Sequence, residues 1–307
     1  MTTRFGYACL NMTLQALKPR ITCNRGMIRR TFDAKGLPYA SELALQNVTD
    51  LVSHVQWNHE HGIEVFRITS CLFPWASEYK LQDLPDYDQI VENLQLAGKL
   101  AKQYGQRLST HPGQYNVLTS PHEHVVQNCI TDLEIHGELF DIMGMPRSPG
   151  AKINIHIGGS YNDKPGTAKR FLQATDQLSA SVYDRLTVEN DDRLNLYTTQ
   201  ELHDMIYMES GIPIVFDYHH HACNPGDLSE RDALALAIST WQNAKPCTHY
   251  SESAQLERGE KAPFRAHSNY IYSKIDDHGF DIDCVVEAKA KEQAVLKYYQ
   301  DHGGPNA

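Results

Sequence analysis

The chain of 307 residues has no cysteines in C-x-x-C spacing and no run of 18 consecutive apolar residues. Its seven cysteines are an odd number, so a reducing cytoplasmic setting is expected rather than a disulfide framework. The lack of long apolar runs argues against a transmembrane helix. The opening "MTTRFGYACLNMTL" also lacks the apolar core of a signal peptide. We therefore expect a cytoplasmic protein that makes no contact with a membrane.

Positive charge is also scarce. The 28 lysines and arginines against 38 aspartates and glutamates give a net charge of −10, so the bulk charge does not indicate nucleic-acid binding. Bound divalent metal ions would reverse the sign locally, so DNA is not excluded. The chain has neither a G-x-G-x-x-G nor a Walker loop, which disfavours an open doubly wound sheet as the fold.

Short runs rich in β-branched residues alternate with segments of helical periodicity. Glycines that end these segments, such as Gly62, Gly105 and Gly211, resemble helix C-caps. Eight such runs predict an α/β protein, a single (β/α)8 TIM barrel over residues 1–307, with the open sheet as the alternative. The long first connection is basic in "RITCNRGMIRRTFDAKG", and we expect a helix after it from about Ser41. The runs cover residues 4–10, 64–70, 107–113, 152–158, 186–192, 212–218, 247–253 and 284–290.

Alternation along the strands predicts which side chains face the barrel axis. In "INIHI" the isoleucines face the helices, which leaves Asn154 and His156 inward. Other strands also place a carboxylate or an imidazole inward near their carboxyl ends, where barrel enzymes have their active sites. Several such groups buried together would be costly unless a cation paired with them. One such residue alone is more often structural, but six together favour divalent Mn, Zn or Fe. The six are His111, His156, Glu189, Asp217, Glu287 and, on a weaker strand, His249.

Seven motifs occur in an order that resembles the UV damage endonuclease family, relatives of endonuclease IV. The resemblance spans nearly the whole chain. It implies a TIM barrel with a trinuclear metal site, usually manganese, which nicks DNA immediately 5′ of ultraviolet photoproducts and other lesions. The products would carry a 3′-hydroxyl and a 5′-phosphate. The motifs are "GYACLNMTL", "HPGQYNVLTSP", "HIGGSYNDK", "VENDDR", "HHACNPG", "AHSNYI" and "VEAKAKEQ".

The same resemblance implies roles for individual residues. Glu189 would be the catalytic carboxylate that bridges metal ions, and His267 would join the ligands from a loop. Gln114 and Tyr115 would probe the damaged base pair, while Tyr7 and Asn11 would line the lesion pocket. The implied ligands are His111, His156, Glu189, Asp217, His220, His249, His267 and Glu287.

Two positions depart from the family pattern. Glu78 stands where the family usually has a histidine ligand, and we expect its carboxylate to serve as a ligand instead. Cys247 stands where the family usually has a lysine, and we interpret it as a small buried thiol. Lys245 has the same strand parity as Cys247 but lies one step deeper, so it is not expected to replace the missing lysine.

These patterns together predict a metal-dependent DNA endonuclease. We expect two or three divalent ions per chain, with Mn favoured, and a monomer that acts on double-stranded DNA containing UV lesions. An abasic-site endonuclease of the endonuclease IV type is one alternative. A metal-dependent sugar isomerase is another, although that interpretation assigns no function to the loop "HPGQYNVLTSP". A non-catalytic DNA-binding relative is the third.

Overall fold

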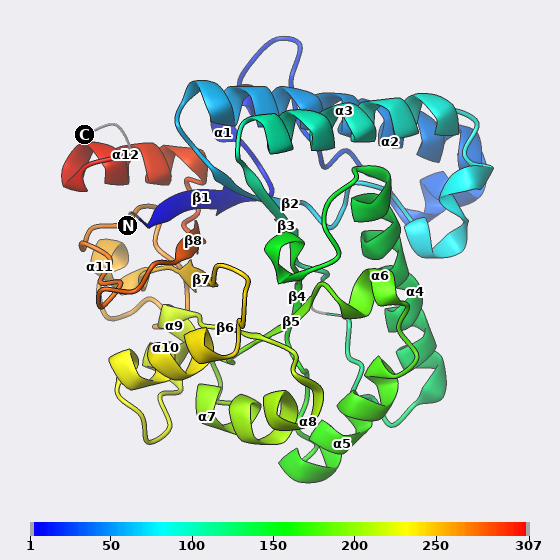
Figure 1. Ribbon diagram of the computed structural model, residues 1–307. Coiled ribbons are helices and arrows are strands. Elements are labelled where there is room, and N and C mark those ends of the chain that lie inside the picture. The colour runs from blue at the N-terminus through cyan, green and yellow to red at the C-terminus, as the bar shows by residue number, and fades with distance from the viewer. Residues whose placement is uncertain (1–2, 114, 305–307) are drawn as a thin grey trace.

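The computed structural model describes residues 3–113 and 115–304, which form a nearly closed barrel of eight parallel strands (Figure 1). The strand order is β6-β5-β4-β3-β2-β1-β8-β7. A parallel bridge between Asp217 and His249 joins the two edge strands. The predicted TIM barrel is confirmed. The strands are β1 (Arg4–Ala8), β2 (Val65–Ile68), β3 (Arg107–Thr110), β4 (Ile153–Ile155), β5 (Leu186–Glu189), β6 (Ile214–Val215), β7 (Cys247–Tyr250) and β8 (Asp283–Val286).

Helices cover the outside of the barrel, as Figure 1 shows. The α-helices are α1 (Met12–Gln15), α2 (Arg29–Glu60), α3 (Tyr87–Gln103), α4 (Glu123–Ile142), α5 (Lys164–Thr175), α6 (Ala180–Tyr183), α7 (Thr199–Leu202), α8 (Met208–Ser210), α9 (Tyr218–Cys223), α10 (Glu230–Ser239), α11 (Gln255–Arg258) and α12 (Glu292–His302). Three short 3₁₀ helices are η1 (Ala76–Glu78), η2 (Leu81–Asp83) and η3 (Pro149–Ala151), and η4 (His203–Tyr207) is a π-helix. Within the described ranges, no helix is both long and apolar enough to cross a membrane.

The first long helix begins earlier than the sequence predicted. Helix α2 starts at Arg29, not near Ser41, and is interrupted at Gly36, whose φ of 62° is not helical. Pro38 lies in the first turn after this kink, where the missing N–H of proline costs no helical hydrogen bond. The second part of the basic segment, from Arg29, therefore supplies the first turns of a helix, whereas residues 20–28 are not helical.

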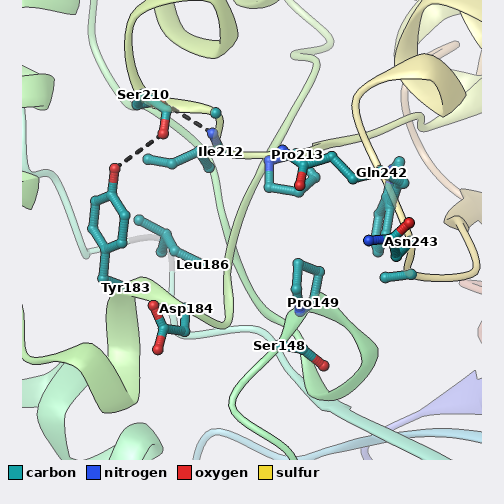
Figure 2. Close-up of a pocket in the computed structure, with 13 residues that line it drawn as sticks. Ser148, Pro149, Tyr183, Asp184, Leu186, Ser210, Ile212, Pro213, Gln242 and Asn243 are labelled. Atoms are coloured by element: carbon teal, nitrogen blue, oxygen red, sulfur yellow. Dashed lines mark hydrogen bonds between the residues drawn. The ribbon is translucent and has the colours of Figure 1, made fainter.

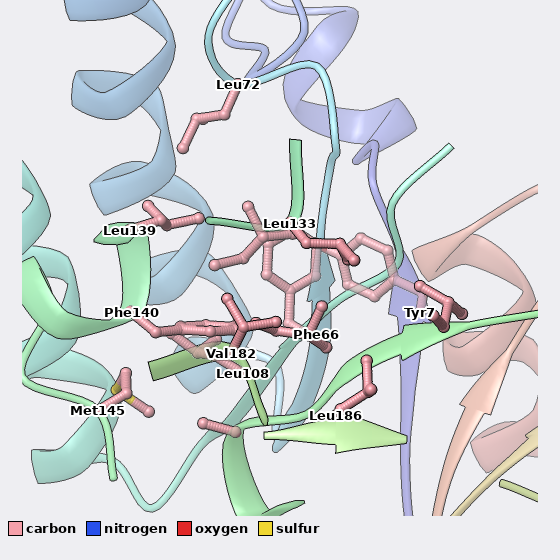
Figure 3. Close-up of a cluster of buried hydrophobic side chains, with 14 of the residues drawn as sticks. Tyr7, Phe66, Leu72, Leu108, Leu133, Leu139, Phe140, Met145, Val182 and Leu186 are labelled. Carbon is pink, nitrogen blue, oxygen red and sulfur yellow. The ribbon is translucent and has the colours of Figure 1, made fainter. Parts of the chain in front are cut away.

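The hydrophobic core lies between the strands and the surrounding helices. Figure 3 shows Leu133 and Phe140 of α4 gathered with Leu108 of β3 in this layer. Ile153 and Ile155 of β4 belong to this core, whereas Asn154 between them bonds to Glu189 on the other face, which confirms the predicted alternation along this strand. Full burial of such a side chain stabilises the fold by about 1.5–3 kcal/mol. This layer holds the strands in register, and so positions the side chains that point into the barrel.

A cavity of about 470 Å³ lies near the amino ends of the strands (Figure 2). Its wall includes Pro149 before β4, Leu186 at the start of β5 and Pro213 before β6. Tyr183 donates a hydrogen bond to the carbonyl of Ser210 across one side. No histidine lines this cavity among the described residues, and it lies at the opposite end of the barrel from the histidine and carboxylate cluster.

Candidate metal centre

The carboxylate of Glu189 is surrounded by imidazoles at the carboxyl end of β5. Its side chain is only 1% exposed. Nitrogens of His111, His220 and His249 lie 3.3, 3.2 and 3.0 Å from its oxygens. Nε2 of His156 lies 4.0 Å away. The four imidazoles come from the ends of four different strands or the turns after them, so the barrel brings together residues that are far apart in the sequence.

The segment after β6 divides its histidines between the cluster and the core. Asp217 is the N-cap of α9, and its Oδ1 accepts a hydrogen bond of 2.7 Å from the backbone N–H of His220. This cap directs Asp217 and His220 toward Glu189. His219 and His221 are both buried; the ring of His221 packs against a phenylalanine, whereas the ring of His219 lies 5.5 Å from that of the loop residue His267, beside the cluster. The histidine triplet thus contributes one residue to the cluster.

Glu287, just after β8, forms the other side of the cluster. Its Oε1 lies 3.3 Å from Nδ1 of His249, and its carboxylate also pairs with Arg67. The loop residue His267 approaches the same carboxylate, with Nδ1 3.9 Å from Oε2. Nδ1 of His267 also lies 3.0 Å from the backbone carbonyl of Glu287. If Nδ1 carries the ring proton, it donates to this carbonyl, and the lone pair of Nε2 is then free to bind a metal ion.

The electrostatics of the metal-free cluster keep its glutamates ionised but do not leave all of its imidazoles neutral. Burial alone would raise the pKa of Glu189, but His249 and His156 hold it well below its ordinary value. Burial likewise opposes ionisation of Glu287, yet Arg67 and His249 lower its pKa. Burial lowers the pKa of His249 to about 3, so at neutral pH the positively charged imidazoles beside Glu189 are those of His156 and His220. The metal-free cluster thus combines ionised glutamates and a neutral His249 with two protonated imidazoles, His156 and His220, that must lose a proton to bind an ion.

The donor set fits divalent metal ions. Ligand atoms of His111, His156 and Glu189 lie within 4.8 Å of one another, and so do those of Glu189, Asp217 and His249. Glu189 belongs to both groups. Oδ2 of Asp217 and Nδ1 of His249 are buried without a hydrogen-bond partner in the part of the chain that the structure describes. A cation would satisfy both atoms, and mixed imidazole and carboxylate ligands suit Mn, Zn or Fe.

Glu78, expected as a ligand, is not brought into this cluster. It lies in η1, is partly exposed, and pairs with Arg29 at 2.7 Å. Among the described residues it forms no hydrogen bond or ion pair with a member of the cluster. Arg29 also pairs with Asp33, so the first turn of α2 holds Glu78 at the rim. Cys247 is buried on β7, as expected of a small thiol.

The residues expected to contact DNA divide into buried and exposed ones. Tyr7 is fully buried and donates a hydrogen bond of 2.8 Å to Asn58. Asn11 is equally buried, donates to the Tyr7 hydroxyl and caps α1. The structure therefore places this pair in the core, and a contact with a lesion stays a prediction. Tyr115 is 83% exposed, whereas Gln114 lies outside the described residues.

Several supporting residues were not predicted as part of the site. Asn154 donates a hydrogen bond to Glu189, and Oδ1 of Asp191 lies 3.0 Å from Nδ1 of His156. Strand alternation in the sequence had already predicted that Asn154 faces inward. Asp191, two residues after Glu189 and beyond the end of β5, had no comparable signal in the sequence. Such contacts orient ligands and contribute to metal affinity.

A parallel eight-stranded barrel with histidines and carboxylates at the carboxyl ends of its strands defines a TIM-barrel protein with a candidate metal centre. Residues 3–304 match the family model described as UV-endonuclease UvdE. The chain belongs to this family, as the resemblance predicted.

Individual relatives agree with this assignment. The chain is 38% identical over 303 residues to a UV-damage endonuclease from Schizosaccharomyces pombe, covering 96% of this chain and 50% of that protein. It is 31% identical to a UV DNA damage endonuclease from Bacillus cereus (strain G9842), covering 97% of this chain and 93% of the relative. The chain thus spans about half the length of the fission yeast relative and nearly all of the bacterial one.

Solved structures resemble the whole barrel. The crystal structure of SacUVDE superposes with a TM-score of 0.84 at 28% identity and covers 98% of both chains. A D-psicose 3-epimerase from Clostridium cellulolyticum H10 has a TM-score of 0.50 at 15% identity, over 77% of this chain and 78% of its own. The second likeness shows the fold alone.

Proposed function

We propose that this protein is a metal-dependent DNA endonuclease that hydrolyses the phosphodiester immediately 5′ of UV photoproducts and other lesions. The products would carry a 3′-hydroxyl and a 5′-phosphate. The observation that carries the proposal is the buried Glu189 carboxylate, shared by two groups of potential metal ligands. The UV DNA damage endonuclease of Bacillus cereus, matched over nearly its full length, supports the choice of substrate.

The chain's own residues suggest how the site would work. His111 and His156 would hold one ion and Asp217 and His249 another, with Glu189 between them. Two or three bound ions, with Mn favoured, would supply charge to polarise a phosphate and make water more acidic. The surrounding hydrogen bonds would keep the ligands in place while substrate binds.

DNA binding needs a contact surface despite the net charge of −10. Glu78 and Tyr115 line one hollow at the barrel mouth, and Glu78 pairs with Arg29 at the start of α2. Arg30 and Lys35 of the same helix are exposed. A basic helix start beside an exposed tyrosine suits a phosphate backbone next to an unstacked base. Tyr115 would fill the space that a displaced lesion leaves.

Cleavage of defined duplexes tests the proposal. Mn²⁺-loaded protein is incubated with three duplexes of one sequence: undamaged, with one cyclobutane pyrimidine dimer, and with one abasic site. We expect a nick immediately 5′ of the dimer, with an end that a DNA polymerase extends, and no nick after chelation. Preferential cleavage at the abasic site would favour the abasic-site endonuclease instead. Unchanged cleavage by metal-free protein would refute metal dependence.

A further inference from the structure

A lysine lies completely inside the barrel. Lys152 directly precedes β4 and has no exposed surface. Its amine lies 2.8 Å from Nε2 of His249. Its hydrogen-bond partner among the described residues is this ring nitrogen, not a carboxylate. A buried amine without a carboxylate partner is costly. The contact with His249 is thus the clearest function for this side chain.

The other ring nitrogen of His249 faces the candidate metal centre. Nδ1 lies 3.0 Å from Oε2 of Glu189 and 3.3 Å from Oε1 of Glu287. It is one of the buried atoms without a hydrogen-bond partner in the described part of the chain. Because both nitrogens belong to one rigid ring, a bond that holds Nε2 also sets the direction of Nδ1.

The barrel interior leaves room for a long side chain beneath His249. Cys247, two residues earlier on the same strand, is small and buried with Ala8, Val215 and Val285. These side chains are apolar or weakly polar, so they offer the Lys152 amine no strong alternative partner. Nδ1 keeps a lone pair for a metal ion only when Nε2 carries the ring proton and donates it to the Lys152 amine. The bond to Lys152 would then set the tautomer of the ring as well as its orientation.

We infer that Lys152 is a positioning residue of the metal centre, which holds His249 through Nε2 so that Nδ1 is directed at an ion shared with Glu189 and Asp217. Lys152 itself would touch neither the ion nor the substrate. The inference rests on the metal centre of the proposed function. It assigns a purpose to a buried lysine that the cleavage chemistry does not use directly.

Two substitutions separate positioning from simple packing. Lys152→Met keeps the length and flexibility of the side chain but removes the nitrogen, whereas Lys152→Gln keeps a polar head that can bond to Nε2. Lys99→Met, at an exposed position of α3, serves as the surface control. The melting temperature of each metal-free variant checks that it folds, because methionine removes a buried charge but also the hydrogen-bond partner of Nε2. Because methionine preserves most of the packing, a pure packing role would leave the His249 signals and the Mn²⁺ affinity of Lys152→Met at the parental level.

The first measurement uses metal-free protein labelled with ¹⁵N-histidine. We expect the two ring nitrogens of His249 to show one fixed hydrogen-bonded state in the parent, an averaged state in Lys152→Met and a restored state in Lys152→Gln. Identical His249 signals in parent and Lys152→Met would overturn the inference. This readout requires neither a bound ion nor DNA cleavage, so it stands apart from the test of the endonuclease activity.

The second measurement is calorimetric titration of each protein with Mn²⁺. Loss of an orienting hydrogen bond typically weakens metal binding about 10- to 100-fold, so Lys152→Met should lose this much affinity for one ion. Lys152→Gln should recover most of it, and Lys99→Met should match the parent. Equal Mn²⁺ affinities in the parent and Lys152→Met would contradict the positioning role. A parent protein that bound no Mn²⁺ would contradict the metal centre itself.

Discussion

Nδ1 of His249 lies 3.0 Å from Oε2 of Glu189, and neither side chain is more than 1% exposed. The two residues lie on strands that are not neighbours in the sheet, because β6 separates β5 from β7. The bridge between Asp217 and His249 joins β6 to β7. Closure of the barrel and assembly of the candidate metal centre therefore depend on the same contact.

Glu189→Gln tests the shared carboxylate. Glutamine keeps the shape of the side chain but loses the charge that four imidazoles surround. Substitution of residues that only support the ligands typically lowers metal affinity or activity about 10- to 100-fold. Loss of this ligand itself should therefore reduce the nicking rate by more than about 100-fold and lower the amount of bound Mn²⁺. Nicking assays and elemental analysis measure both effects, and circular dichroism checks the fold. A variant that nicks at the parental rate would remove Glu189 from the mechanism.

The strand pattern in the sequence was sufficient to predict the barrel and most of the cluster. In β4 and β5, alternation places isoleucines, leucine and valine outward, which leaves His156 and Glu189 inward. The direction of Glu78 could not be predicted in this way, because it is set by Arg29, which lies 49 residues earlier. The contact of Lys152 with His249 could not be predicted from the sequence either, because it joins two residues 97 positions apart across the barrel interior.

Glu78→Ala should leave metal content unchanged, in contrast to the ligand role that the sequence suggested. The reason is the pairing of Glu78 with Arg29 at the rim, apart from the cluster. Because this ion pair is partly exposed, its loss should change the free energy of unfolding by no more than about 1 kcal/mol. Elemental analysis after Mn²⁺ reconstitution measures the ions, with His156→Ala as the control that should lose metal. A missing ion in Glu78→Ala would restore the ligand role.

Tyr115→Ala should weaken the preference for damaged DNA without loss of metal. The side chain is 83% exposed, so its removal should not disturb the core. Stacking of a base on an aromatic ring is worth about 1–3 kcal/mol, which corresponds to roughly tenfold or more in discrimination between damaged and undamaged duplexes. Tyr115→Phe keeps the ring and should behave like the parent in a competition binding assay. Equal discrimination by Tyr115→Ala and the parent would reject the probing role.

Metal binding should release protons, and affinity should rise with pH. Burial alone would lower the pKa of His156, but Glu189 and Asp191 raise it to about 9 in the metal-free protein. Asp217 and Glu189 likewise outweigh burial and raise the pKa of His220 to about 11. Both imidazoles are therefore protonated at pH 7 without metal and must each lose a proton before they can bind an ion.

Calorimetry in buffers of different ionisation enthalpy measures this release. We expect up to two protons released per chain at pH 7, and a Mn²⁺ affinity that falls as the pH is lowered below neutrality. In His220→Gln the release should decrease by about one proton, because a titrating ligand is lost while a polar side chain remains. Binding enthalpies that are independent of the buffer would show that these two histidines are already neutral, or that they do not bind the ions.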